Sequence, residues 1–259
     1  MSNLGIIGNG FVGNSLSKLF TKHTVLVFDI LDSKCLHPFE QLVMCDVIFI
    51  CLPTPTKNGK CDISLVIDTV LKLKKHLYKG VIIVKSTVVP GTTNSLKCIY
   101  PRILFNPEFL REKHAVFDTL HPDRILIGGE EPDSVILKDI YLEYFSKEIL
   151  YIESDPTIFE MVKYMSNTFL ATKVSVFNEF YNLAEKKNIE YNTLLNYLLL
   201  DKRINSSHTK VPGDDNKLGY GGNCFIKDTE AFIHYYSENK VECPILLAIT
   251  NYAQNKIEK

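Results

Sequence analysis

The feature that most constrains the fold is a group of glycines directly behind an apolar run near the N-terminus. Residues 4–7 read Leu-Gly-Ile-Ile, and the pattern Gly-x-Gly-x-x-Gly follows before an amphipathic stretch over 15–20. In a strand-turn-helix unit the first glycine allows a tight turn, the second lets a pyrophosphate approach the backbone, and the third lets the helix pack on its strand. An ordinary glycine-rich turn is the alternative. The residues of the predicted dinucleotide loop are Gly8, Asn9, Gly10, Phe11, Val12 and Gly13.

An acidic residue follows the second predicted strand. The apolar stretch 24–28 ends at Asp29, at the distance from the glycines where an acid binds both ribose hydroxyls of NAD. The same carboxylate repels the 2′-phosphate of NADP, so we expect NAD as the cofactor.

Composition favours a globular enzyme. The chain has 259 residues, of which 46% are hydrophobic, and a formal net charge of −1, which gives no electrostatic case for binding nucleic acid or an anionic membrane. No apolar run approaches the length of a membrane span, and the first strand leaves no room for a signal peptide, so we expect a cytoplasmic protein. The seven cysteines include no Cys-x-x-Cys pair, which argues against a disulfide framework or a zinc site, and we expect no metal.

Strand-like and helix-like segments alternate through the first 150 or so residues. Strand-like runs occupy 47–51, 81–84, 103–105 and 124–127, and helix-like segments occupy 64–76 and 132–146. This alternation predicts an α/β fold, a Rossmann-like doubly wound parallel sheet. Polar motifs follow three of these strands, where ligands of such sheets bind.

The pattern changes near Ser154. Residues 157–187 have helical periodicity without glycine or proline, which predicts one long helix. Glu160, Lys163 and Asn167 lie on one face of this helix, and a solvated salt-bridge face is the alternative to a functional one. We therefore expect an NAD-binding domain over 1–153 and an all-helical domain over 154–259.

The second half also contains a candidate nucleophile. Cys224 stands in the run Gly-Tyr-Gly-Gly-Asn-Cys-Phe-Ile-Lys-Asp over 219–228, at the end of a predicted loop over 201–223, and helices are expected over 228–239 and 244–257. Glycines allow close approach of a substrate, and the nearby Lys227 favours the thiolate. A small buried side chain in a turn is the alternative.

Eight motifs stand in a fixed order along the chain. They are Gly8-x-Gly10-x-x-Gly13, Pro53-Thr-Pro-Thr56, Ser86-Thr-Val-Val-Pro-Gly-Thr-Thr93, Asn106-Pro-Glu-Phe-Leu110, Pro122-Asp-Arg-Ile125, Glu160-x-x-Lys163-x-x-x-Asn167, Asp201-x-Arg203-Ile204 and Gly219-Tyr-Gly-Gly-x-Cys-Phe-x-Lys-Asp228. Together they resemble the UDP-glucose/GDP-mannose dehydrogenase family, most nearly its UDP-glucose branch. The resemblance implies a Rossmann-like domain followed by a helical central domain that forms a homodimer.

The resemblance also implies a reaction. It is the oxidation of a nucleotide sugar, expected to be UDP-glucose to UDP-glucuronate, with two molecules of NAD and no release of the aldehyde. Relatives also oxidise UDP-N-acetyl sugars or GDP-mannose, so these substrates stay open. Lys163, with Asp228 and a water near Thr87, would take up the alcohol proton. Cys224 would form a thiohemiacetal and then a thioester, and Glu108 would activate the water that hydrolyses it.

Binding roles follow from the same resemblance. Arg203 matches an arginine that the family contributes from the neighbouring subunit. The residues implied for the UDP-sugar are Glu108, Phe109, Leu110, Lys163, Asn167, Arg203, Tyr220, Gly221 and Gly222. Besides the glycine loop and Asp29, those implied for the cofactor are Pro53, Thr54, Thr87, Glu112 and Lys227.

The chain departs from the family's pattern at three places. Lys113 stands where the family has glycine, and Ile226 stands where it has proline, but neither removes a reacting group. Family members normally carry a further nucleotide-binding domain, and this chain stops at Lys259, before it.

Other interpretations stay open at this point. One is a truncated NAD-binding remnant, or half of a split enzyme, without independent turnover; retention of the whole reactive set argues against simple decay. Another is a 2-hydroxyacid or 6-phosphogluconate type of dehydrogenase with a similar two-domain plan. Such an enzyme needs no nucleophilic thiol, so Cys224 discriminates between the two classes.

Overall fold

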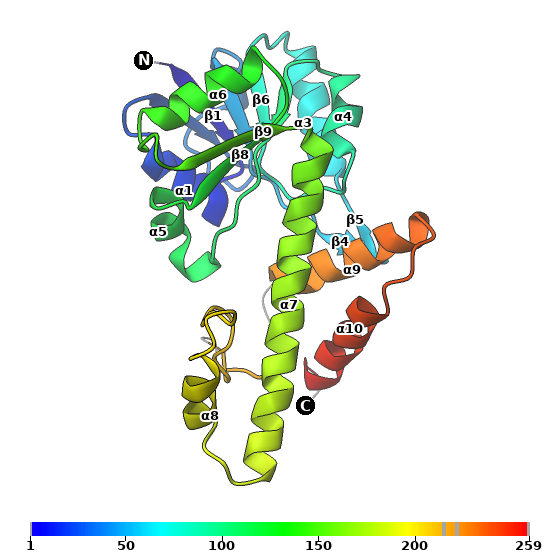
Figure 1. Ribbon diagram of the computed structural model, residues 1–259. Helices are drawn as coiled ribbons and strands as arrows, with labels where there is room; N and C mark the ends of the chain where they lie inside the picture. The colour runs from blue at the N-terminus through cyan, green and yellow to red at the C-terminus, as the bar shows by residue number, and fades with distance from the viewer. Residues whose placement is uncertain (1, 214–215, 221–222, 258–259) are drawn as a thin grey trace. The chain divides into compact units, whose positions relative to one another are not determined.

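The chain forms two compact units. A computed structural model describes residues 2–213, 216–220 and 223–257, except the side chains of 223 and 252–257. Unit 1 comprises Met1–Pro55 and Asp62–Lys163, and unit 2 comprises Thr56–Cys61 and Tyr164–Lys259. The division falls within helix α7 (Pro156–Lys186), the long helix in Figure 1.

Unit 1 contains a seven-stranded sheet in the order β2-β1-β3-β6-β7-β8-β9. The strands are β1 (Asn3–Ile7), β2 (Thr24–Phe28), β3 (Val47–Ile50), β6 (Val81–Val84), β7 (Ile103–Phe105), β8 (Arg124–Gly128) and β9 (Leu150–Ser154). Neighbouring strands are parallel except β7 and β8, so the predicted Rossmann-like sheet is confirmed with one antiparallel pair. The chain between β7 and β8 comes back to the end of the sheet at which β7 finishes. Strand β8 starts there and therefore runs in the opposite direction.

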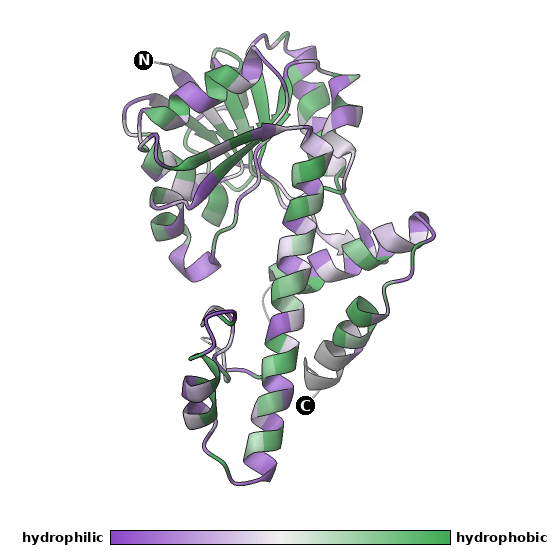
Figure 2. Ribbon diagram, in the orientation of Figure 1, coloured by the Kyte–Doolittle hydropathy of each residue, from purple (hydrophilic) through white to green (hydrophobic). Residues whose placement is uncertain are grey.

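Helices cover both faces of this sheet. The helices of unit 1 before α7 are α1 (Phe11–Leu19), α2 (Phe39–Leu42), α3 (Ser64–Lys75), α4 (Thr92–Lys97), the 3₁₀ turn Glu112–His114, α5 (Ala115–Leu120) and α6 (Asp133–Leu142). Ile48 and Ile50 of β3 pack in one core cluster with α2, α3 and α4, whereas Val47 and Phe49 pack in the other with α1 and α6. The central strands β3 and β6 are consequently buried along their whole length. Figure 2 shows much of the sheet in the green of hydrophobic residues.

The glycine loop lies at the point where the strand order reverses. The chain passes from β1 to β2 on one side and then to β3 on the other side of β1, which is the usual ligand-binding point of such sheets. Gly8 has φ +97°, and a Cβ there would lie 2.4 Å from the carbonyl oxygen of Cys51. A Cβ on Gly13 would lie 1.9 Å from the carbonyl oxygen of Gly8, so helix α1 can approach its strand only without a side chain at this position.

Unit 2 is mainly helical. It contains the remainder of α7, the hairpin β4 (Thr56–Lys57) and β5 (Lys60–Cys61), α8 (Tyr191–Leu198), α9 (Asn223–Glu238) and α10 (Pro244–Ile257). Two apolar clusters stabilise it, one around Ala171, Tyr220 and Ile249, and another that includes Phe177 and Tyr191. No described helix is long and apolar enough to cross a membrane.

Some elements differ from the sequence-based expectations. The long helix is confirmed within one residue at each end. Helix α9 begins at Asn223 rather than near 228, so Cys224 lies in its first turn and not in a loop. The hairpin was missed, although Asn58-Gly59, with φ of 51° and 79°, is a common two-residue hairpin turn.

Substituting Gly13 by alanine should destabilise the protein. A helical glycine-to-alanine change normally stabilises, but here the added methyl group meets a backbone carbonyl that cannot move aside. We expect a loss of about 1–3 kcal/mol or more, measured by urea denaturation. Gly10→Ala is the matched control, because no atom lies within 4 Å of its Cβ position. Equal stability of the two variants would contradict the packing argument.

Candidate active site

The glycine loop and Asp29 fit a dinucleotide. Gly10 precedes the first helical residue of α1, and the space at its Cβ position is open, so a ligand can approach the backbone there. The carboxylate of Asp29 accepts hydrogen bonds from the backbone N–H groups of Asn9 (2.7 Å) and Leu31 (2.9 Å). These bonds hold the acid directly beside the glycine loop. Phe11 and Val12 are the first residues of α1.

The polar loops behind β3 and β6 are bonded to each other. The Thr54 hydroxyl donates to the Thr87 carbonyl at 2.6 Å, and the Ser86 hydroxyl donates to the Leu52 carbonyl at 2.7 Å. Thr54 and Thr87 are buried, while Pro53 is exposed. Two of the predicted polar motifs thus meet at the carboxyl ends of neighbouring strands.

Lys163 and Glu108 form a buried ion pair. Lys163 Nζ lies 3.0 Å from Glu108 Oε1 and donates to the Glu108 carbonyl at 2.6 Å. The other carboxylate oxygen, Oε2, accepts from the backbone N–H of Leu110 at 2.7 Å. The two side chains are only 5% and 10% exposed. The structure therefore brings together two predicted catalytic residues that are far apart in the sequence.

The environment of Glu108 keeps its carboxylate ionised. Burial acts to raise its pKa, but the Lys163 ammonium, the Leu110 N–H and the Lys85 ammonium together hold the pKa below its usual value. Because the folded pKa is depressed, the resulting stability is fully present above the unfolded pKa of about 4.3. It is lost as the pH falls through the folded value.

The Phe109 ring lies close to two cations. The Arg124 guanidinium is 4.4 Å from the centre of its ring, and Lys163 Nζ is 5.2 Å from the same point. Arg124 belongs to the Pro-Asp-Arg-Ile motif, but the sequence assigned it no role. Cation–π attraction of this kind stabilises the loop that carries Glu108.

Glu160 has a structural role that the sequence did not reveal. Its carboxylate is fully buried and accepts from the backbone N–H groups of Gly91 (2.6 Å) and Thr93 (2.8 Å) at the start of α4. Burial raises its pKa, and the hydrogen bonds at Thr93 and Gly91 oppose the rise. Unlike Lys163 on the same helical face, Glu160 caps a helix.

In unit 2, Asp228 is the centre of a second polar group. Asn167 Nδ2 donates to its Oδ2 at 2.6 Å, and Lys227 Nζ lies 2.5 Å from its Oδ1. The Asp228 side chain is only 2% exposed. The Thr56 hydroxyl of the hairpin donates to the Lys227 carbonyl at 2.6 Å and so binds the first part of helix α9 to the hairpin.

Cys224 is half-buried in the first turn of α9. It lies four residues before Asp228, and side chains at this spacing share one face of a helix. Backbone N–H groups at a helix N-terminus favour a thiolate. The predicted substrate residues Gly221 and Gly222 lie outside the described part of the chain.

Three further predicted residues have clear positions. The Tyr220 ring is buried in the apolar cluster with Ala171, and its hydroxyl donates to the Ile249 carbonyl at 3.4 Å. Arg203 is 88% exposed and pairs with Asp201 at 2.6 Å. Glu112 is exposed in the 3₁₀ turn.

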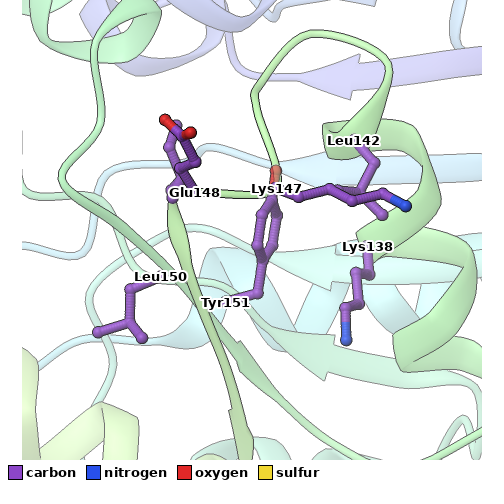
Figure 3. A pocket seen from close by; sticks show the side chains of 7 residues that line it. Lys138, Leu142, Lys147, Glu148, Leu150 and Tyr151 are labelled. Carbon is purple, nitrogen blue, oxygen red and sulfur yellow. The ribbon is translucent and has the colours of Figure 1, made fainter.

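Unit 1 also contains a hollow. It has a volume of about 540 Å³ and is lined by α6, residues 147–149 and the first two residues of β9. Figure 3 shows Lys138, Glu148 and Tyr151 around it. None of the predicted site residues lines it. Among the described residues, no cluster of His, Cys, Asp and Glu side chains is placed to hold a metal ion.

The fold and the glycine loop define a dinucleotide-binding α/β protein with a helical second part. Comparison with known sequences is more specific. The chain belongs to the UDP-glucose/GDP-mannose dehydrogenase family: residues 35–145 match its NAD binding domain and residues 158–255 match its central domain. The glycine loop precedes the first match, so its assignment depends on its own geometry.

Curated relatives agree with this membership. The UDP-glucose 6-dehydrogenase of Rickettsia prowazekii (strain Madrid E) is 36% identical over 213 residues, which are 79% of this chain and 48% of the relative. The UDP-glucose 6-dehydrogenase YwqF of Bacillus subtilis (strain 168) is 32% identical over 229 residues, 84% of this chain and 50% of the relative. The chain thus spans about half the length of these relatives.

Solved structures show the same fold. A UDP-glucose dehydrogenase from the archaeon Pyrobaculum islandicum is 29% identical, with a TM-score of 0.86 over 97% of this chain and 68% of that one. The 3-hydroxyisobutyrate dehydrogenase of Mycobacterium tuberculosis, at 16% identity, has a TM-score of 0.76 over 98% of this chain and 93% of that one. At this identity the second likeness concerns the fold alone.

Removing Lys163 from the buried ion pair should lower the stability of the protein. Lys163→Met leaves Glu108 buried without its cation, and we expect a loss of about 3–5 kcal/mol in urea denaturation. Adding Glu108→Gln to this variant should restore part of the loss, because the unpaired charge is then gone.

The control uses the more exposed pair of Lys138 and Glu153, which are 3.0 Å apart. Lys138→Met should cost no more than about 1 kcal/mol. If Lys163→Met cost no more than this control, the Lys163–Glu108 pair would not be a buried one in solution.

Proposed function

We propose that this chain binds NAD and oxidises a UDP-sugar, with UDP-glucose as the expected substrate and UDP-glucuronate as the product. The observation that carries the proposal is the largely buried pair of Lys163 and Glu108, two reactive groups held together behind the carboxyl ends of the parallel strands. Similarity to UDP-glucose 6-dehydrogenases supports the substrate. In this proposal residues 1–153 form the NAD-binding domain and residues 154–259 form the central domain.

The cofactor-binding groups follow from the loop geometry. The backbone around Gly10 and the N-terminus of α1 would take the pyrophosphate, and Asp29 would bind the adenosine ribose. Pro53, Thr54, Thr87, Glu112 and Lys227 are the further proposed cofactor residues. NAD supplies the hydride acceptor for each of the two oxidations.

The proposed first step moves a proton from the sugar hydroxyl. The Asp228 carboxylate, through a water near Thr87, takes up this proton. The Lys163 ammonium donates a hydrogen bond to the same oxygen and stabilises the negative charge that develops on it as the proton leaves. Asn167 is bonded to Asp228 at 2.6 Å and would orient sugar hydroxyls.

The proposed second oxidation is covalent. The thiolate of Cys224 adds to the aldehyde carbon to give a thiohemiacetal, whose oxidation gives a thioester. Water then adds to the thioester carbon, the C–S bond breaks, and the thiol and the carboxylate product separate. A nucleophilic thiol must stay reduced, which agrees with a cytoplasmic location.

Glu108 is the proposed base for the hydrolysis. Its carboxylate is ionised at neutral pH for the reasons given above, so it can take a proton from the attacking water. Phe109 and Leu110 belong to the same loop and are proposed to contact the substrate, together with Tyr220, Gly221 and Gly222.

We also propose a homodimer through α7. Beyond its first turns, α7 exposes the large apolar side chains of Met165, Phe169, Val176, Phe180 and Leu183. Their spacing of three, four and seven residues places them along one stripe of the helix. Such a stripe is typical of a helix that packs against a second chain. The exposed Arg203 is the residue proposed to reach the partner's substrate.

The mechanism predicts the effect of Cys224→Ser. With NAD and UDP-glucose, the unmodified protein should form NADH and UDP-glucuronate in a two-to-one ratio, because one carbon is oxidised twice. The variant should form less than about a hundredth of the uronate, since an alcohol is a much weaker nucleophile than a thiolate. Cys98→Ser is the control, because this thiol is exposed in unit 1.

The outcome separates the interpretations. Uronate formation at the parental rate by Cys224→Ser would refute the covalent step. Measurable NAD binding without turnover would instead support a binding remnant or half of a split enzyme.

The dimer has its own test. Phe169→Asp should convert the protein from dimer to monomer in light scattering, because it places a charge within the apolar stripe. Phe117→Asp is the matched control, an exposed phenylalanine of α5 in unit 1. A monomeric unmodified protein would refute the proposed homodimer.

A further inference from the structure

Lys85 is a buried lysine for which the proposed reaction has no role. It follows β6 directly, and its backbone N–H donates to the Ile50 carbonyl at 2.9 Å. Its Nζ donates to Asn106 Oδ1 at 2.9 Å and lies 3.4 Å from the Pro107 carbonyl oxygen. Both acceptors belong to the segment that leads into Glu108. Only 7% of the residue is exposed.

Asn106 is fixed by three elements of unit 1. Besides Lys85, its Oδ1 accepts from the Tyr141 hydroxyl of α6 at 2.6 Å, and its Nδ2 donates to the Leu126 carbonyl of β8 at 2.7 Å. Every polar atom of this buried side chain has a partner. The backbone that carries Glu108 is therefore held in one place.

The charged groups around Lys85 form one cluster. Burial lowers the pKa of Lys85 to about 8, the Lys163 ammonium acts in the same direction, and the Glu108 carboxylate opposes the change. Burial raises the pKa of Cys51 to about 12, so this thiol is neutral. Burial likewise raises the pKa of Tyr141. Glu108 is thus the anion of a cluster with two cations.

In the described part of unit 1, no carboxylate lies within ion-pair distance of Lys85 Nζ. Its hydrogen-bond acceptors are neutral, yet its charge lowers the pKa of Glu108. When Lys163 turns to the substrate oxygen, burial favours a protonated Glu108, and the Leu110 N–H and the Lys85 ammonium remain to oppose it. A second cation at a fixed position counteracts this effect.

We propose that Lys85 is a positioning residue, which holds the Asn106–Glu108 segment in place and keeps Glu108 ionised while Lys163 acts on the substrate. The inference deepens the proposed function and rests on it for the role of Glu108. The ionisation of Glu108 can be measured without turnover, so the two proposals can fail separately.

Two variants separate the effect of the Lys85 charge from the effect of its hydrogen bond to Asn106. Lys85→Gln retains a donor for Asn106 Oδ1 and removes the charge, whereas Lys85→Met removes both. We would follow the Glu108 carboxyl carbon by ¹³C NMR over pH, with the signal assigned by Glu108→Gln. Both variants should raise the pKa of Glu108 by about one unit, and the acid limb of uronate formation should move by the same amount. The exposed Lys75, changed to glutamine, should leave this pKa unchanged.

Equal Glu108 titrations in the unmodified protein and in Lys85→Gln would overturn the electrostatic role. If the variants fail to fold, a titration of the unmodified protein still tests the proposal. Its Glu108 signal should show a second step near pH 8 as Lys85 loses its proton, and absence of this step would overturn the inference. A coupled titration in a protein that does not oxidise UDP-glucose would support the role of Lys85 and refute the proposed reaction.

Discussion

The structure depends on the way the first turns of α7 are bound to the sheet of unit 1. Phe159 packs in the core cluster beneath α3, Glu160 caps α4, and Lys163 pairs with Glu108. An apolar, a capping and an ionic contact thus follow one another within two turns of one helix. Because each contact is buried, the start of α7 is part of the α/β unit although the remainder belongs to the helical unit.

The general fold could be predicted because its determinants are local. Glycine spacing, apolar runs and the long helix are properties of neighbouring residues, and a sequence can show them directly. The antiparallel β8 and the cap made by Glu160 could not be predicted. Both depend on contacts between residues far apart in the sequence, which no local periodicity encodes.

The candidate site likewise has a part that the sequence predicts and a part that only the structure shows. Motifs named Glu108, Lys163, Asn167 and Asp228, but only the structure pairs them, two by two, within their own units. Lys85 stands directly before the motif that begins at Ser86 and was given no role from the sequence, and its own chemistry became visible only through its burial. A lysine in a sequence gives no indication of whether water surrounds it, and this decides its pKa.

The hairpin has a consequence for the covalent organisation of the chain. Residues Thr56–Cys61 leave unit 1 after Pro55 and return to it at Asp62, and the chain passes to unit 2 again after Lys163. Three peptide segments therefore connect the units, and a recombinant fragment cut out after Lys163 would lack the segment that donates to the Lys227 carbonyl and pairs Lys60 with Glu238. Although almost all of unit 2 is contiguous, it is not a module that a single cut can release.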